Sequence, residues 1–269
     1  MSEIDSKTHQ RDTYIYFSKD VNGYKIKDPK EESVVTVPRR VTTVIHDYFA
    51  PFDEDKIIKN MMNSKNWTKS DYYGKNSDQI KQAWQEARDL GTAMHDQIEH
   101  YTLEYPDIKM EVPDTKEFKL FLEFWEPFMK ERPDWKVFRA EWTIYGDGIA
   151  GSMDLTLYKP GTNEIIILDW KRCTAIRREN RFQKGIYPFN QFDDCNYVHY
   201  NIQLNIYRHI LQKFYGKKVV EMFLVGLHPK QNEPEIIPVH VLDLESCWNY
   251  ICENSKKRQM DALKNPTKH

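Results

Sequence analysis

The sequence has few cysteines and no long apolar run. Its four cysteines form no CxxC pair and no zinc-ribbon spacing; they are Cys173, Cys195, Cys247 and Cys252. We therefore expect free thiols in a reducing compartment. No apolar run approaches the ~20 residues that a membrane-spanning helix needs. The N-terminal stretch MSEIDSKTHQRD is polar and unlike a signal or transit peptide, so we expect an intracellular, soluble protein that binds no membrane.

The chain also lacks an excess of charge of either sign. Its 39 Lys and Arg residues nearly balance 41 Asp and Glu residues, which gives a formal net charge of −2. A protein that coats nucleic acid indiscriminately would be strongly basic, so this class is disfavoured, whereas a local basic groove is compatible with the balance. Internal repeats and low-complexity tracts are absent as well.

The patterning of apolar residues predicts an α/β or α+β fold in a chain long enough to bury a full core. Helices are expected over 53–63, 77–103, 115–130 and 197–215 and from about 243, and strands over 13–17, 135–145, 149–158, 164–169, 218–227 and 236–242. We expect a loosely held polar segment over 1–33. A single domain over 34–269 would follow, with a helical part over about 50–130 and a core over about 135–263.

The stretch GSMDLTLYKPGTNEIIILDWKR, residues 151–172, predicts a β-hairpin with charged residues on its arms. A turn centred just after Gly161 places Asp154 opposite Asp169, with Cβ atoms roughly 5 Å apart. Because side chains alternate along a strand, Lys171 lies on the same face as Asp169. Two carboxylates and one ammonium therefore meet on one face of the hairpin.

Two carboxylates so close together repel each other, and one of them would normally take up a proton. A divalent cation removes this conflict, since hard cations such as Mg²⁺ or Mn²⁺ bind carboxylate oxygens together with water and phosphate oxygens. Lys171 would then orient or deprotonate a water molecule, or stabilise charge on a phosphate. A solvated hairpin with ordinary Asp–Lys pairs is the alternative, because the tripeptide D-x-K is common.

Two predicted helices carry further candidates. In LGTAMHDQIEHY, residues 90–101, His95 and Glu99 share a face one turn apart. A helical histidine is usually structural or solvated, but a neutral imidazole also suits a metal site that holds two carboxylates. In HYNIQLNIYRHIL, Gln203 and Tyr207 share a face and suit the fixing of a phosphate or a catalytic side chain. Alone, these two residues are typical of a helix surface.

The segment KRCTAIRRENRFQK, residues 171–184, holds six basic residues and one acid. Such a run is either solvated or a loop that contacts phosphates. Aromatic residues accompany it, among them Phe182 and Tyr187, and this interleaving suits single-stranded nucleic acid. The acidic pair Asp193 and Asp194 interrupts the pattern. The candidates for contact with DNA are Arg172, Arg177, Arg178, Arg181 and Lys184.

Taken in order, these motifs resemble the PD-(D/E)XK nuclease superfamily. The order is G-x-x-x-H on a helix, an upstream acid, G-S-M-D, I-L-D-W-K and Q-x-x-x-Y. Within the superfamily the match is to the RecB-type exonuclease branch, which includes the mitochondrial genome-maintenance exonuclease and related phage and large-virus proteins. The resemblance covers roughly residues 34–227. The segments SVVTVPRRVTTVIHDYF and FDEDKIIKNMM also look like the N-terminal region of such viral and phage exonucleases.

The resemblance implies a restriction-endonuclease-like core, in which helices flank a central mixed sheet, with an N-terminal helical region. By resemblance, His95, Asp154 and Asp169 would hold Mg²⁺ or Mn²⁺ and Lys171 would be the catalytic lysine, with Glu141 as the upstream acid and Gln203 and Tyr207 as the trailing motif. Some members carry a four-cysteine iron–sulfur cluster. The cysteine spacing here does not fit one, and we expect none.

The expected function is a metal-dependent DNA exonuclease that acts on DNA ends and prefers single strands, in replication, repair or recombination. The cytoplasm of a phage- or virus-infected host would suit it. The nearest alternative is an RNA endonuclease of the cap-snatching kind; the helix with Gln203 and Tyr207 and the lack of polymerase-like sequence count against it. A catalytically silent DNA-binding protein on the same fold is an alternative of another class. The intact set of Asp154, Asp169 and Lys171 counts against that.

Overall fold

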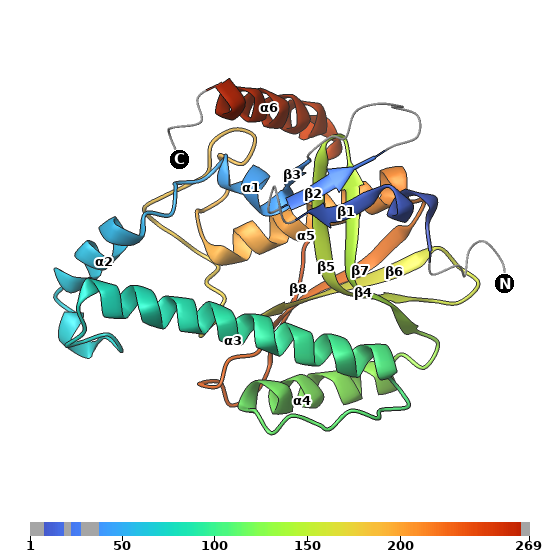
Figure 1. Ribbon diagram of the computed structural model, residues 1–269, viewed down its shortest axis with the longest axis horizontal. Coiled ribbons are helices and arrows are strands. Elements are labelled where there is room, and N and C mark those ends of the chain that lie inside the picture. Colours follow the sequence, from blue (N-terminus) through green and yellow to red (C-terminus); the bar gives the residue numbers. More distant parts are fainter. Residues whose placement is uncertain (1–7, 19–22, 28–37, 265–269) are drawn as a thin grey trace.

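A computed structural model describes residues 8–18, 23–27 and 38–264 of the chain. These residues form a mixed α+β fold in which helices flank a central mixed sheet, as the sequence predicted (Figure 1). The start of the segment SVVTVPRR, residues 33–37, lies outside the described residues. No described helix is long and apolar enough to cross a membrane.

The six-stranded sheet is built around three antiparallel neighbours, as predicted. They are β4 (Lys136–Gly146), β5 (Ile149–Tyr158) and β6 (Glu164–Lys171). Beyond β6, the parallel β7 (Lys218–Gly226) is followed by the antiparallel β8 (Glu235–Pro238), and β3 (Arg39–Arg40) runs parallel to the start of β5. The pairing of Leu155 with Leu168 is the register expected for a turn centred just after Gly161.

One edge of β5 is divided between two partners. Its first two residues pair with β3, and the stretch from Leu155 onward pairs with β6. Between Gly151 and Asp154, no described strand pairs with this edge. β5 and β6 therefore separate in the middle of the sheet, and Asp154 stands at the point of separation.

Helices cover both faces of the sheet, so its central strand β6 is buried on both sides. Ile165 and Ile167 belong to a core shared with α1 (Val41–His46), α5 (Asn196–Phe214) and α6 (Glu245–Lys264). Ile166 and Leu168 belong to a core shared with α3 (Ser77–Glu104) and α4 (Lys116–Lys130). Each such side chain stabilises the fold by about 1.5–3 kcal/mol, which is why this strand reads as a continuous apolar run.

Three helices begin at side chains that accept a hydrogen bond from the first turn. Asp53 caps α2 (Glu54–Met62), Thr115 caps α4, and Asn76 forms a capping box with Gln79 at α3. These caps satisfy backbone N–H groups that have no partner within the helix. Short 3₁₀ helices lie at Gln10–Thr13 and Trp67–Lys69. α3 is the longest helix, and it extends from α2 at one end to α4 at the other (Figure 1).

The N-terminal segment is more ordered than we expected. Its described residues include a hairpin of β1 (Ile15–Ser18) and β2 (Gly23–Ile26), which packs Ile26 in a small core with Tyr145 and Ala150. Asp12 accepts hydrogen bonds from the side chains of Arg139 and Trp142 on β4. The prediction of a loosely held segment is therefore wrong for residues 8–18 and 23–27, because these contacts attach them to the sheet.

The predicted strand over 236–242 ends earlier, at Pro238. The buried side chain of Asn205 explains this end. It donates to the carbonyl of His240 at 2.9 Å and accepts from the N–H of Leu242 at 2.8 Å. These backbone groups bind a side chain of α5 instead of a neighbouring strand.

Candidate active site

Asp154 is fixed at the point where β5 and β6 separate. Its Oδ2 accepts a hydrogen bond from the backbone N–H of Trp170 at 2.7 Å. The carboxylate thus takes the place of a strand carbonyl as the partner of that N–H. Burial raises the pKa of Asp154, because the charged form has lost its contact with water.

Asp169 and Lys171 form a buried ion pair on β6. Lys171 Nζ lies 2.6 Å from Asp169 Oδ2, and the side chain of Asp169 is 2% exposed. The ammonium also lies 4.6 Å from the centre of the Tyr200 ring. The Lys171 ammonium is thus the partner of Asp169 Oδ2 through both its charge and a hydrogen bond.

Burial raises the pKa of Asp169 to about 6, and the nearby Lys171 offsets only part of this effect. For Lys171 the balance goes the other way. Burial lowers its pKa, but Asp169 and Asp154 raise it by more, so the net shift is upward and the side chain is an ammonium.

Glu141 lies on β4 opposite Asp154. The pairs on either side, Ala140 with Leu155 and Trp142 with Met153, place these two acids across from each other. Glu141 has a φ of 44°, a left-handed conformation that is rare for a residue with a side chain. Its Oε2 accepts a hydrogen bond from the Ser152 hydroxyl at 3.0 Å. Backbone strain of this kind often accompanies functional sites.

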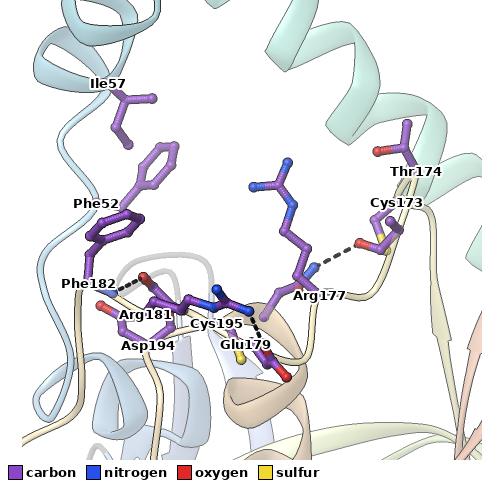
Figure 2. A pocket seen from close by; sticks show the side chains of 13 residues that line it. Phe52, Ile57, Cys173, Thr174, Arg177, Glu179, Arg181, Phe182, Asp194 and Cys195 are labelled. Carbon is purple, nitrogen blue, oxygen red and sulfur yellow. Dashed lines mark hydrogen bonds and ion pairs between the residues drawn. The ribbon is translucent and has the colours of Figure 1, made fainter.

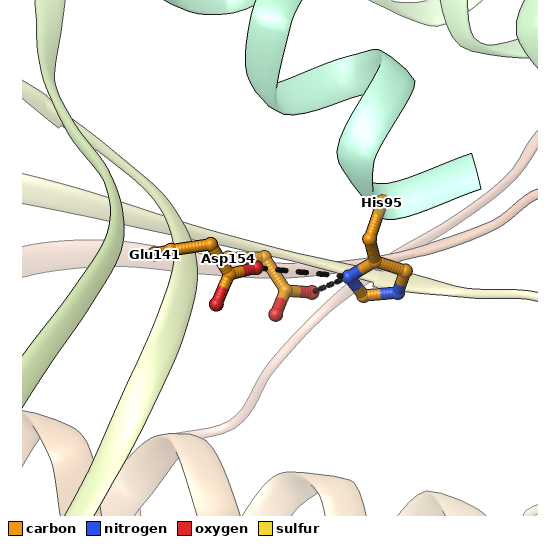
Figure 3. Close-up of side chains that lie close together, drawn as sticks. All are labelled: His95, Glu141 and Asp154. Carbon is orange, nitrogen blue, oxygen red and sulfur yellow. Dashed lines mark ion pairs between the residues drawn. The ribbon is translucent and has the colours of Figure 1, made fainter. Parts of the chain in front are cut away.

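His95 reaches these acids from α3 (Figure 3). Its Nδ1 lies 3.6 Å from Asp154 Oδ2 and 4.0 Å from Glu141 Oε1. Burial lowers the pKa of His95, but Asp154 and Glu141 outweigh it and raise the pKa to about 9. One ligand atom from each of His95, Glu141 and Asp154 lies within 4.8 Å of the other two.

The residues present fit a divalent cation. Three acids converge here with one imidazole, and such oxygen and nitrogen donors suit Mg²⁺ or Mn²⁺. Burial raises the pKa of both Asp154 and Asp169, and the negative charge of Asp154 raises the pKa of Asp169 further, so a divalent cation would relieve the repulsion between these buried carboxylates. The sequence grouped His95, Asp154 and Asp169 as ligands. In the structure Glu141 joins His95 and Asp154, while Asp169 is paired with Lys171.

Gln203 and Tyr207 also lie beside this site, on α5. The Gln203 amide donates a hydrogen bond to the Tyr207 hydroxyl at 3.1 Å. Tyr207 is buried against Gly151 of β5, where an added Cβ would lie 2.7 Å from the ring. Glycine is therefore needed at 151 for α5 to approach the strand so closely.

The basic residues predicted to contact DNA lie in different environments. Arg172 Nε donates to Glu117 of α4 at 2.8 Å, and both side chains are largely buried. Arg181 lies 3.9 Å from Glu179 and Lys184 lies 3.8 Å from Asp193. Arg178 lies over the ring of Tyr197. Arg177 lines an open cavity of about 820 Å³ together with Arg181 (Figure 2).

By sequence, the chain matches no known protein family and no curated protein. Among solved structures it is similar to a protein named SSO0001, with 14% identity over 86% of this chain and 81% of that one and a TM-score of 0.36. It is also similar to a candidate exonuclease from Eubacterium rectale, with 18% identity over 86% of this chain and 83% of that one and a TM-score of 0.38. Likeness at this level carries no conclusion about activity.

Sequence reasoning missed two features of the site. The first is the position of Glu141 across from Asp154, which the dipeptide Asp147-Gly148 could have predicted. A tight turn centred between these two residues places 141 opposite 154. The second is Tyr200, whose place under Lys171 depends on how α5 packs against the sheet and has no local signal.

Proposed function

We propose that this protein is a metal-dependent nuclease that hydrolyses phosphodiester bonds at DNA ends, prefers single strands, and serves DNA replication, repair or recombination. One observation carries the proposal: His95, Glu141 and Asp154 meet within ligand distance of one another beside the Asp169–Lys171 pair. This combination of carboxylates, imidazole and ammonium suits phosphodiester hydrolysis with a divalent ion. The motif order of the PD-(D/E)XK superfamily supports the same assignment.

The acids and the imidazole would hold the ion. His95, Glu141 and Asp154 would bind it directly, and Asp169 would contribute a carboxylate oxygen. When bound, Mg²⁺ or Mn²⁺ activates water as the nucleophile and offsets negative charge on the phosphate in the transition state. The hydrogen bond from the Trp170 N–H holds Asp154 in place for this task.

Lys171 would act on the phosphate or on the attacking water. Its pKa is raised, so it carries a proton and donates hydrogen bonds rather than accepting a proton. Asp169 and the ring of Tyr200 hold the ammonium at the edge of the site. Gln203 holds the Tyr207 hydroxyl by a hydrogen bond, and the Tyr207 ring packs on Gly151. The two residues would thereby fix the position of α5 relative to β5.

The test uses end-labelled single-stranded DNA, duplex DNA and single-stranded RNA, each incubated with Mn²⁺, Mg²⁺ or EDTA. We expect single-stranded DNA to be shortened from an end in either metal and to stay intact in EDTA. The matched control is Asp154→Asn, which removes one charge and keeps an oxygen for the Trp170 N–H.

The same assay separates the alternatives. Internal cleavage of RNA with DNA left intact would favour an RNA endonuclease of the cap-snatching kind. DNA binding without cleavage in either metal would favour a catalytically silent protein on this fold.

A further inference from the structure

The open cavity beside the site has two exposed aromatic rings in its wall. Phe52 is 67% exposed and Phe182 is 95% exposed. Figure 2 shows both rings on one side of the cavity below Ile57, with the side chain of Arg177 extending into the space on the other side. Water contact with large apolar rings is unfavourable, and aromatic residues exposed together commonly mark a binding surface.

The segment that carries Phe182 is held in place rather than loose. The backbone N–H of Phe182 donates a hydrogen bond to Asn180 Oδ1 at 3.1 Å. Asn180 in turn donates from its backbone to Asp193 Oδ2 at 3.0 Å and from its amide to the Asp194 carbonyl at 2.6 Å. The loop thus presents the ring to solvent through a set of specific hydrogen bonds.

The segment that carries Phe52 is also held by Asp194. Ala50 N–H donates to Asp194 Oδ2 at 3.3 Å, while Oδ1 of Asp194 lies 2.9 Å from His199 Nε2. The Phe52 ring also rests against Trp84 of α3, with centroids 6.0 Å apart. Asp194 therefore connects the two segments that bear the rings, which keeps both of them at the cavity.

Charge and position describe what the cavity accepts. Arg177 lines it and makes no ion pair with any residue that the structure describes, and the Arg181–Glu179 pair is largely exposed and so weak. Cys173 and Thr174 also line the cavity, and they follow Lys171 closely in the chain. Aromatic faces beside a free guanidinium, next to the candidate active site, match one nucleotide of a strand: a flat base and its phosphate.

We propose that Phe52 and Phe182 bind an unpaired base of single-stranded DNA by stacking, with Arg177 on the adjacent phosphate. The identity of the strand as DNA rests on the proposed function. A base inside a duplex already stacks on its neighbours and offers no free face, so this site selects unpaired strands. The cavity thereby accounts for a preference for single strands that the metal site alone does not create.

The test compares oligo-dT with an abasic oligonucleotide of equal length, which keeps the phosphates and lacks the bases. Binding is measured by fluorescence anisotropy in EDTA, so that no cleavage occurs. We expect Phe182→Ala and Phe52→Ala each to weaken binding of oligo-dT about tenfold and to leave binding of the abasic strand unchanged. Phe17→Ala is the matched control: this ring is 54% exposed but lies on the N-terminal hairpin, and its loss should change neither affinity.

Equal losses on both strands, or no loss on oligo-dT, would overturn the base-stacking site. Melting curves of the variants exclude misfolding as the cause of a loss. Cleavage of end-labelled DNA by the wild type is scored separately. If the wild type cleaves DNA but its binding does not depend on bases, the proposed function stands and the stacking site is overturned. If binding depends on bases but no cleavage occurs, the stacking site stands and the proposed function is overturned. Oligo-U RNA bound more tightly than oligo-dT, with the same dependence on Phe182, would overturn the assignment to DNA.

Discussion

Asp154 has two tasks that substitution can separate. It belongs to the candidate ligand set, and it accepts the hydrogen bond of the Trp170 N–H. We expect Asp154→Asn to abolish Mn²⁺ binding and cleavage, because a charged ligand is lost. The fold should stay intact, because repulsion among the crowded carboxylates falls and an acceptor oxygen remains for the Trp170 N–H. Asp154→Ala also leaves a backbone N–H without its partner, which should lower the free energy of unfolding by about 1–3 kcal/mol relative to Asn.

Calorimetry with Mn²⁺ and urea unfolding measure these two effects independently. Turnover at the wild-type rate by purified Asp154→Asn would remove Asp154 from the ligand set. Equal stability of the Asn and Ala variants would mean that the hydrogen bond to Trp170 contributes nothing to the fold.

Lys171 should act on the rate and not on metal affinity. In Lys171→Met the apolar stem is kept and the ammonium is lost, so Asp169 stays available to a cation. We expect unchanged or tighter Mn²⁺ binding and a fall in kcat of about 100-fold or more, as for the loss of one donor to a transition state. If Mn²⁺ affinity disappears together with activity, Lys171 has a structural role.

His95 should distinguish between metals. Its imidazole is the one nitrogen donor in the set, and nitrogen suits Mn²⁺ better than the harder Mg²⁺. His95→Ala should therefore weaken activation by Mn²⁺ more than activation by Mg²⁺ in titrations of both ions. The same activity as wild type across both titrations would make His95 an ordinary helical histidine.

For individual residues, the sequence predicts positions best where the geometry is local. Alternation along a strand and the position of one turn predicted that Asp154, Asp169 and Lys171 lie together. The predicted pairing of Asp154 with Asp169 is wrong in detail, because the ladder of β5 and β6 ends at Leu155 and Leu168 and Asp154 binds the Trp170 N–H. For His95 the sequence indicated only a candidate ligand, and its approach to the acids was implied by resemblance, because it depends on how Met94 and Ile98 pack α3 against α4 and the sheet. Such packing arises from contacts between distant segments, which no short motif encodes.

The end of β6 and the start of α4 are joined by the pair of Arg172 and Glu117. The sequence placed Arg172 among the residues that contact DNA, but its guanidinium is largely buried on Glu117. We expect Arg172→Met to lower the free energy of unfolding by about 3 kcal/mol, because it leaves Glu117 as a buried charge without a partner. Urea unfolding measures this change, and adding Glu117→Gln should restore part of it.

A different outcome would support the original prediction for Arg172. In that case the free energy of unfolding would be unchanged. The slope of log affinity for DNA against log salt would become less steep by about 0.7, the amount for one phosphate contact.

Among the elements, those with a continuous or periodic apolar pattern were predicted correctly. β6 and α4 are examples, since burial on a sheet or against a core leaves a clear pattern in the sequence. The pairing of β1 with β2 was not predicted. The hairpin packs Ile26 against Tyr145 of β4, and Asp12, just before β1, binds Arg139 and Trp142 of the same strand. A lone aspartate gives no sign of a partner more than a hundred residues away.

On the scale of the whole molecule, charge is separated although the total is near zero. Asp154 and Asp169 of the candidate site lie beside Lys171, where the basic 171–184 segment begins, and the open cavity is lined by Cys173, Thr174, Arg177 and Arg181 of the same segment. A DNA strand would therefore meet positive charge along its phosphates and a cation-binding cluster at its reacting bond. The near-neutral total means that binding must depend on this local arrangement.

The salt dependence of DNA binding tests this arrangement. Each phosphate contact to a single strand releases condensed counterions and contributes about −0.7 to the slope of log affinity against log salt. Replacing Arg177, Arg178 and Arg181 together by Ala should weaken binding, raise KM strongly, and flatten the slope by roughly two units. Mn²⁺ affinity without DNA should not change, because none of the three lies in the ligand set.

The matched control removes the same number of exposed charges elsewhere, at Lys256, Lys257 and Lys264 on α6. We expect this variant to keep the wild-type slope within a few tenths of a unit, since long-range charge is largely screened at ordinary salt. If both variants flatten the slope equally, the strand responds to total charge and no local groove exists. If the arginine variant binds and digests single strands normally at every salt concentration, the loop is a solvated run, and the phosphate contacts must lie on the helices before residue 131.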